Sequence, residues 1–309
     1  MSSKAEMSSG LTNGVLQGYK SGLGFSRMES GFKKGLLNGI RNHNKVQDPT
    51  VGIIADKAPK FLWIADYTNT GGTYPPTSGS VISSTDGPYE LIGGGLMVAA
   101  SNPVFRGNGV YYNKGYVDFS TSADRISTST TVVGTSELTV VMLLRLSSTL
   151  TGVLFQRGAS STVGDITISS IGGNKIRVTF IGSPSTTSSV YETYESTIAT
   201  TTTTSDGTNN NKWFILTVKF DMTQRNGNGS EMEIYIDGVK NMTPITTTFT
   251  GTSTAMSNLT AHYGNTTTQS NDVNFRCQIA SSIYFDYWLN NTEQTRIENF
   301  YRYYYGHRF

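Results

Sequence analysis

The sequence has a single cysteine among 309 residues, Cys277, and only 15% of its residues are charged. One cysteine excludes an intrachain disulfide and a cysteine-based zinc site, and it indicates synthesis in a reducing compartment. An apolar run of about 20 residues is also missing, which predicts that the chain does not span a membrane. The polar first ten residues predict no secretory signal. The sparse charge argues against sequence-specific binding of nucleic acid.

Ser and Thr are abundant instead, 78 residues together, and there are 33 glycines. Thr fits pleated strands and Gly fits turns, so this composition favours β-structure. Hydrophobic residues make up 36% of the chain, which is enough to bury a sizeable core. Long stretches rich in Ala, Glu, Lys and Leu do not occur, so a coiled-coil fibre is excluded as the main body.

The N-terminal region carries the one internal repeat. Gly recurs every fourth residue from position 10 to 22 and again from 31 to 39, and a large apolar residue follows each of these seven glycines. Residues 1–60 also hold nine Lys or Arg against four Asp or Glu. Seven glycines at about 1 kcal/mol each make an isolated helix unstable. We therefore expect residues 1–45 to form a basic arm, extended or helical, that is ordered by a partner.

The expected docking residues of this arm are its glycines, apolar residues and paired lysines: Leu11, Gly14, Val15, Gly18, Tyr19, Gly22, Leu23, Phe32, Lys33, Lys34, Gly35, Leu36, Gly39 and Ile40. The alternative is a flexible leader without a docking role. Net positive charge on the arm indicates an acidic partner.

Residues 46–60 are polar, contain two prolines and are predicted to be a linker. From residue 61 onward, short β-branched and aromatic runs alternate with turn residues, as at 115–119, 137–146, 213–220 and 231–236. Asp237-Gly238 predicts a tight turn. Many strands without intervening helices predict an all-β antiparallel sandwich, and only the C-terminus is predicted to be helical, with Asn291 or Thr292 as its cap.

Four segments resemble a known superfamily. The segment from Trp213 to Lys240 resembles the central hairpin of the laminin-G-like, concanavalin A-like lectin and glucanase jelly roll, and 278–300 is similar to its closing strand and helix. Upstream, 61–67 and 115–120 resemble the opening strands of such domains in virus and bacteriophage structural proteins. The resemblance covers residues 61–309 and implies a jelly-roll sandwich with a short C-terminal helix.

Candidate catalytic groups are few. Retaining glycosidases need two carboxylates about 5–5.5 Å apart. The nearest approach is Glu231, Glu233 and Asp237, which we interpret as a solvent-facing strand edge, so we predict no enzymatic activity. The three histidines are far apart in sequence, and we expect Cys277 to be a buried apolar residue. We expect no cofactor and no metal, although the acidic residues near strand ends leave a structural calcium open: Asp66, Asp118, Asp124, Asp206 and Asp221.

The C-terminal segment is rich in aromatic and basic residues. Two interpretations stay open: a second interface, since such side chains make good anchors, or packing of the helix end on the sandwich. The residues concerned are Tyr301, Tyr303, Tyr304, Tyr305 and Phe309.

From the resemblance and the arm we expect a non-enzymatic structural protein of a virus or bacteriophage particle. The arm would attach it to a capsid, tail or fibre protein, in multiple copies or as a homo-oligomer, after synthesis in the host cytoplasm. The alternative is a carbohydrate-binding adhesion module that contacts host glycans through an aromatic- and Asn-lined groove. The fold alone does not decide between them.

Overall fold

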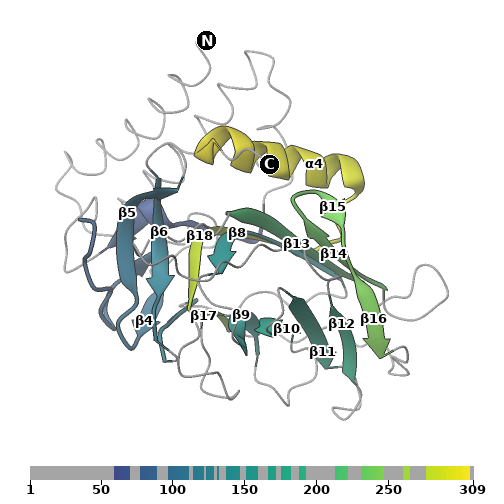
Figure 1. Cartoon of the computed structure of the whole chain (residues 1–309), viewed down its shortest axis with the longest axis horizontal. Coiled ribbons are helices and arrows are strands. Elements are labelled where there is room, and N and C mark those ends of the chain that lie inside the picture. Colours follow the sequence, from purple (N-terminus) through teal and green to yellow (C-terminus); the bar gives the residue numbers. More distant parts are fainter. Residues whose placement is uncertain are drawn as a thin grey trace, which may run out of the picture.

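The computed structural model places two packed β-sheets with a helix against one of them (Figure 1). It describes residues 59–69, 77–88, 97–110, 114–121, 123–128, 131, 137–146, 151–158, 166–171, 175–181, 188–192, 213–221, 231–246, 260–264 and 276–306. The arm at 1–45 and most of the linker at 46–60 lie outside these residues, so the predicted domain boundary stays a prediction.

The sheet beneath the helix is called sheet I. Its strands are antiparallel, and their order is β15 (Val239–Lys240), β14 (Glu231–Ile236), β13 (Phe214–Asp221), β8 (Glu137–Leu146), β18 (Cys277–Phe285), β6 (Lys114–Phe119) and β5 (Val104–Val110), with β1 (Phe61–Ile64) paired to β18.

The second sheet is called sheet II and is also antiparallel. Its order is β16 (Thr243–Thr246), β12 (Ser188–Glu192), β11 (Ile176–Ile181), β10 (Ile166–Ile171), β9 (Thr151–Arg157), β17 (Ala261–Gly264), β7 (Arg125–Ser127) and β4 (Val98–Ala100). A short 3-10 turn, η1 (Ala65–Tyr67), follows β1. Strand β2 (Thr68–Asn69) comes next and pairs with β3 (Gly87–Pro88) in a separate two-stranded sheet.

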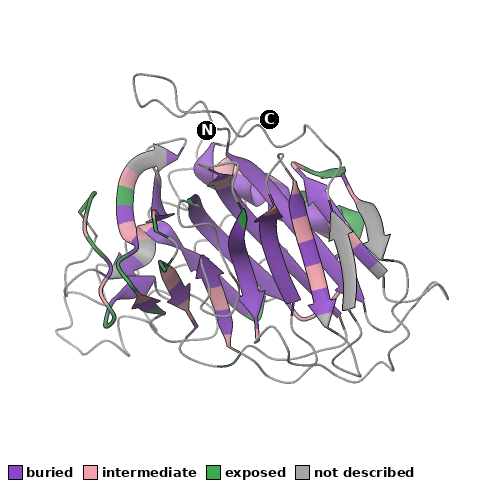
Figure 2. Ribbon diagram, turned by 60° about the horizontal axis from the view of Figure 1, so that its bottom comes forward, coloured by how far each residue is buried: buried purple, intermediate pink, exposed green. Residues whose placement is uncertain are grey.

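The main core lies between the two sheets. In β13, Phe214, Leu216 and Val218 point into it, because side chains alternate along a strand. Phe220 of sheet I meets Phe180 of sheet II there, with ring centroids 4.1 Å apart. Figure 2 shows the resulting purple, buried strands in both layers. Removal of so much apolar surface from water is the main force that stabilises the sandwich.

The helix α4 (Asn291–Tyr305) covers the other face of sheet I and closes a second core. Its cap is Asn290, whose side chain accepts a hydrogen bond from the Glu293 amide, while the Glu293 carboxylate accepts one from the Asn290 amide. This capping box satisfies two amides that a helix start leaves unpaired. The helix was predicted, but with the cap one or two residues too late.

The all-β antiparallel sandwich with a short C-terminal helix is thus the observed fold. Strands β8 and β14 have the predicted bounds, and β13 is central, between β14 and β8. The predicted turn is also present: Asp237 and Gly238 have φ values of 52° and 86°, the left-handed conformation that a two-residue hairpin of this type requires.

Candidate functional site

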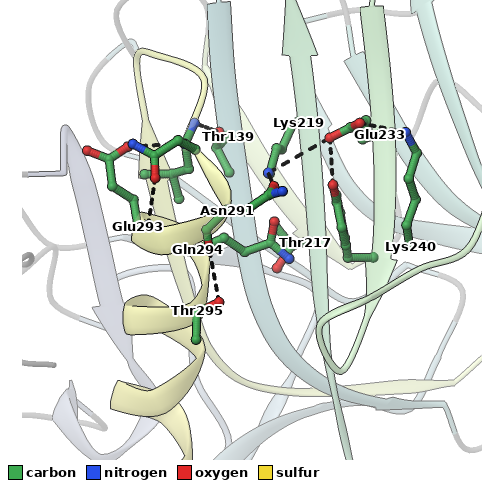
Figure 3. A network of polar contacts seen from close by, with 12 residues as sticks. Thr139, Thr217, Lys219, Glu233, Lys240, Asn291, Glu293, Gln294 and Thr295 are labelled. Carbon is green, nitrogen blue, oxygen red and sulfur yellow. Dashed lines mark hydrogen bonds and ion pairs between the residues drawn. The ribbon is translucent and has the colours of Figure 1, made fainter.

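The outer face of sheet I carries a polar network under the first turns of α4 (Figure 3). At its centre, Lys219 on β13 has a side chain with 0% exposure. Its ammonium nitrogen lies 3.2 Å from Oδ1 of Asn291, the first residue of α4, and 3.8 Å from Oε2 of Glu233 on β14. The rings of Tyr235 and Trp288 lie 4.7 and 5.6 Å from the same nitrogen.

The pairing of strands explains this convergence. Lys219 faces Glu233 directly across the β13–β14 ladder, and Thr217 faces Tyr235. All four share the outer face with Trp213 and Ile215, because Phe214, Leu216 and Val218 point into the main core. Because α4 packs on this face, it shields the Lys219 side chain from solvent.

Glu233 is held by three donors. Its Oε1 accepts from Lys240 Nζ at 2.5 Å and its Oε2 from the Tyr235 hydroxyl at 2.7 Å, in addition to the ion pair with Lys219. Burial would raise the pKa of Glu233, but these hydrogen bonds and charges outweigh burial and hold the pKa below its ordinary value. Burial lowers the pKa of Lys219, and the nearby carboxylates of Glu233 and Glu298 only partly restore it.

A second part of the network lies about two turns further along the helix, around Glu298. Glu298 is buried, and its Oε1 accepts from Gln294 Nε2 at 2.7 Å and from the Thr217 hydroxyl at 3.4 Å. Burial raises its pKa. The β14–β15 hairpin turn lies close to the same carboxylate: a Cβ added at Gly238 would be only 2.6 Å from Glu298 Oε2. The network therefore joins β13, the β14–β15 turn and α4.

Two of the three acids considered for glycoside hydrolysis, Glu233 and Asp237, are used structurally. Glu233 is committed to the network, with a side chain that is only 13% exposed, so the expectation of a solvent-facing edge is wrong for this residue. Asp237 Oδ1 accepts a hydrogen bond of 2.7 Å from the amide of Ile215, which fixes the turn to β13. Glu231 pairs with Asp221 across β13 and β14 at the far end of the hairpin. Glu233 and Asp237, the two of these acids whose side chains are described, therefore already serve as hydrogen-bond acceptors within the fold.

Sequence reasoning missed a polar row on the outer face of sheet II. Ser127 and His262 are 135 residues apart, yet Ser127 Oγ lies 2.7 Å from His262 Nδ1. The cross-strand partners continue the row with Gln156, Thr167 and Thr179. These side chains face outward because their neighbours Tyr263, Phe155 and Val178 belong to the main core. No local signal reveals the row, since it runs across strands.

Among the described residues, the charged group that acts on the Ser127–His262 pair is Arg125 and not an acid. Burial and the charge of Arg125 lower the pKa of His262, so the imidazole is neutral near pH 7. A triad needs an acid to orient the imidazole, whereas the charged group that perturbs His262 is a cation. Gln156 and Thr167 are buried, at 1% and 3% exposure, so the row offers the hydroxyls of Ser127 and Thr179 and the imidazole of His262. The expected aromatic- and Asn-lined groove is not formed by the described residues of the row.

The C-terminal tyrosines belong to the second core. Tyr301 and Tyr305 are fully buried, and Tyr304 is 7% exposed. The Tyr301 hydroxyl donates to the carbonyl of Val141, and the Tyr305 hydroxyl to that of Ala280. The structure therefore favours packing on the sandwich, and the second interface is wrong for these three side chains. Tyr303 is partly exposed, and Phe309 lies outside the described residues.

Two other predicted core residues are confirmed. Cys277 on β18 is fully buried, and burial raises the pKa of its thiol well above the ordinary value. Trp213 is 4% exposed, and its ring packs edge-on to Tyr116 and under the Arg145 guanidinium, which lies 5.1 Å from the ring centroid. Trp213 is thus a core residue of the helix side and not a sugar-stacking platform.

Three of the five candidate calcium ligands accept hydrogen bonds from the protein itself, and a fourth, Asp221, is buried at 1% exposure. Asp66 accepts from the Gly115 amide, and Asp118 from Gln278. Asp124 accepts from the amides of Ser120 and Thr121. Asp206 and the docking residues of the arm lie outside the described residues. Within the described ranges, no group of three or more His, Cys, Asp or Glu residues could hold a metal ion, and no helix there is long and apolar enough to cross a membrane.

Comparison with known proteins places the fold. No protein-family model matches the sequence, and no curated protein matches it. Solved structures do match: a binding domain of botulinum neurotoxin serotype G, with a TM-score of 0.52 and 17% identity over 78% of this chain and 51% of that one. The receptor-binding domain of a C/D mosaic serotype gives 0.50 and 13% over 79% and 51%.

The chain shares its two-sheet β-sandwich fold with these structures. It spans about half the length of these matched structures. At such low identity the likeness concerns the fold alone. Both matched structures are described as binding domains and not as catalytic domains.

Proposed function

We propose that the chain is a non-enzymatic structural protein of a virus or bacteriophage particle, attached through residues 1–45 to a capsid, tail or fibre protein and displaying the sandwich. It is made in the host cytoplasm and incorporated in several copies. The proposal draws on the arm's repeat and charge and on the resemblance of the body to virion domains.

The observation that carries the proposal is where the N-terminal region joins the body. The Lys60 amide donates to the carbonyl of Tyr284 at 2.9 Å, and Lys60 Nζ lies 3.2 Å from Asp286 Oδ2. Tyr284 lies on β18 of sheet I, and Asp286 directly follows that strand. The chain therefore enters the body in the layer of sheet I and not in that of sheet II (Figure 1). Attachment at this layer would leave the outer face of sheet II turned away from the particle.

Co-purification with intact particles tests this proposal. We expect the full chain to band with purified particles at a fixed copy number and to remain there after a salt wash, because apolar residues of the arm dominate its docking. A soluble protein of unrelated sequence, expressed at the same level, serves as the control. Absence of the chain from purified particles would contradict the virion role.

The polar row of sheet II favours a second candidate function, a carbohydrate-binding adhesion module. Sugars are recognised by hydroxyl and amide groups that converge on a preformed surface, and Ser127, His262 and Thr179 all retain partial exposure.

Binding to a glycan array tests this second candidate function. We expect His262→Ala to weaken any binding about tenfold, the effect of one lost hydrogen bond to a neutral group, and Thr292→Ala on exposed α4 to leave it unchanged. Equal loss in both variants, or no binding to any glycan, would argue against the row as a binding surface.

A further inference from the structure

Lys219, Asn291 and Glu233 form a constellation that the proposed function does not use (Figure 3). The Lys219 nitrogen lies 3.2 Å from the carboxamide oxygen of Asn291, so the carboxamide carbon, one bond further on, lies next to the same nitrogen. Oε2 of Glu233 lies 3.8 Å from that nitrogen and is itself oriented by the Tyr235 hydroxyl. The nitrogen is fully shielded from water, with aromatic rings on two sides.

We propose that Lys219 and Asn291 become joined by an isopeptide bond, formed by the folded protein itself with Glu233 as the proton-transfer group. The bond would tie the central strand β13 to the first turn of α4. It does not depend on the proposed function.

The step balances without any other reactant. Glu233 takes one proton from the Lys219 ammonium, and the neutral amine attacks the Asn291 carboxamide carbon, so that a bond forms between Lys219 Nζ and Asn291 Cγ. The bond between Cγ and Nδ2 then breaks. Nδ2 leaves with its own two hydrogens, the proton held by Glu233 and the second proton shed by Nζ, as an ammonium ion. The product amide keeps one hydrogen on Nζ.

Three features of the site suit this chemistry. Burial among aromatic rings lowers the pKa of Lys219 and so favours the nucleophilic amine. Glu233 is ionised near neutral pH, since hydrogen bonds from Lys240 and Tyr235 hold its pKa below the ordinary value, and its Oε2, 3.8 Å from the Lys219 nitrogen, is the carboxylate oxygen placed to receive the proton. Asn291 is exposed at the helix start, which gives the leaving ammonia a route to solvent.

Proximity lowers the barrier to the reaction. Amine and carboxamide are held in contact by β13 and by the capping box that fixes the start of α4. Holding two reactants in contact in a folded protein gives effective concentrations of about 10⁵ M or more when their alignment is good. A reaction that is negligible between free lysine and asparagine therefore becomes accessible here.

Intact-mass measurement of the purified full chain tests the bond. We expect a mass lower by one ammonia than that of the sequence, and a tryptic peptide in which the segment containing Lys219 is linked to the segment containing Asn291. Cleavage after Lys219 should be lost. Recovery of both segments unlinked, with a free Lys219 amine and an intact Asn291, would overturn the proposal.

Matched variants separate this bond from other losses of ammonia, since Asn-Gly pairs such as those at 226–227 and 228–229 can also lose ammonia by ring closure. Asn291→Ala keeps those pairs and should regain the full mass. Glu233→Gln, which keeps the shape of the side chain, should leave Lys219 and Asn291 unlinked in a protein whose circular dichroism is unchanged. A linked peptide in Glu233→Gln would show that Glu233 does not transfer the proton, and the assigned chemistry would be wrong.

Discussion

Replacing Tyr301 with Ala is expected to lower the free energy of unfolding by about 4 kcal/mol, the cost of removing a large aromatic side chain from a core. The ring is fully buried and lies beside Phe300 and Tyr305. Its hydroxyl donates to the carbonyl of Val141 at 3.1 Å. Urea denaturation followed by tryptophan fluorescence measures the change, because Trp213 belongs to the same second core.

Tyr303→Ala is the matched control, since Tyr303 is a partly exposed tyrosine on the same helix. We expect it to cost about 1 kcal/mol or less, as most substitutions near the surface do. Tyr301→Phe keeps the ring and should cost about 1 kcal/mol, the value of one hydrogen bond. Equal stability of the Tyr301→Ala and Tyr303→Ala proteins would mean that α4 does not close a core, and the second-interface interpretation would return.

The sandwich could be predicted because its signals are local. An alternating apolar pattern fixes a strand within a few residues, and Asp237-Gly238 fixes a turn by the backbone conformation it adopts. The pairing of β1 with β18, more than 200 residues apart, carries no such signal. Short strands such as β7 and β17 were also missed, because three or four residues are too few to show a period.

The polar network was hidden for a related reason. Thr217 and Lys219 are polar residues at alternate positions of β13. Polar residues at alternate positions are the usual pattern of a strand with one face in solvent, so they gave no sign of a buried network. Only the docking of α4 turns Lys219 into a buried cation with Asn291 above it. The useful sequence signal was the combination of Lys219 with Trp213 and Ile215 on one face, since apolar residues on both faces of β13 require a cover on both sides.

The arm carries the other large expected effect. Gly14, Gly18 and Gly35 each stand beside a large apolar residue in a four-residue repeat. This spacing suits close contact with a partner backbone. Under the proposed virion role, replacing all three with Leu is expected to abolish incorporation into particles, because the added side chains would overfill a close contact of the arm with its partner. The amount of chain per purified particle, measured by quantitative mass spectrometry, gives the result.

Replacing the same three glycines with Ala separates bulk from backbone stiffness. Ala raises helix propensity by about 1 kcal/mol per site, as much as Leu or slightly more, but adds only a methyl group. Incorporation should therefore fall less for the Ala protein than for the Leu protein.

Replacing Lys33 and Lys34 with Gln should weaken docking mildly and in a salt-dependent way, since exposed charges contribute chiefly at low ionic strength. If the triple Leu protein enters particles at the normal level, the repeat is a passive leader. Attachment then runs through the body, whose partly exposed residues on α4, Tyr303 among them, would be the next surface to change.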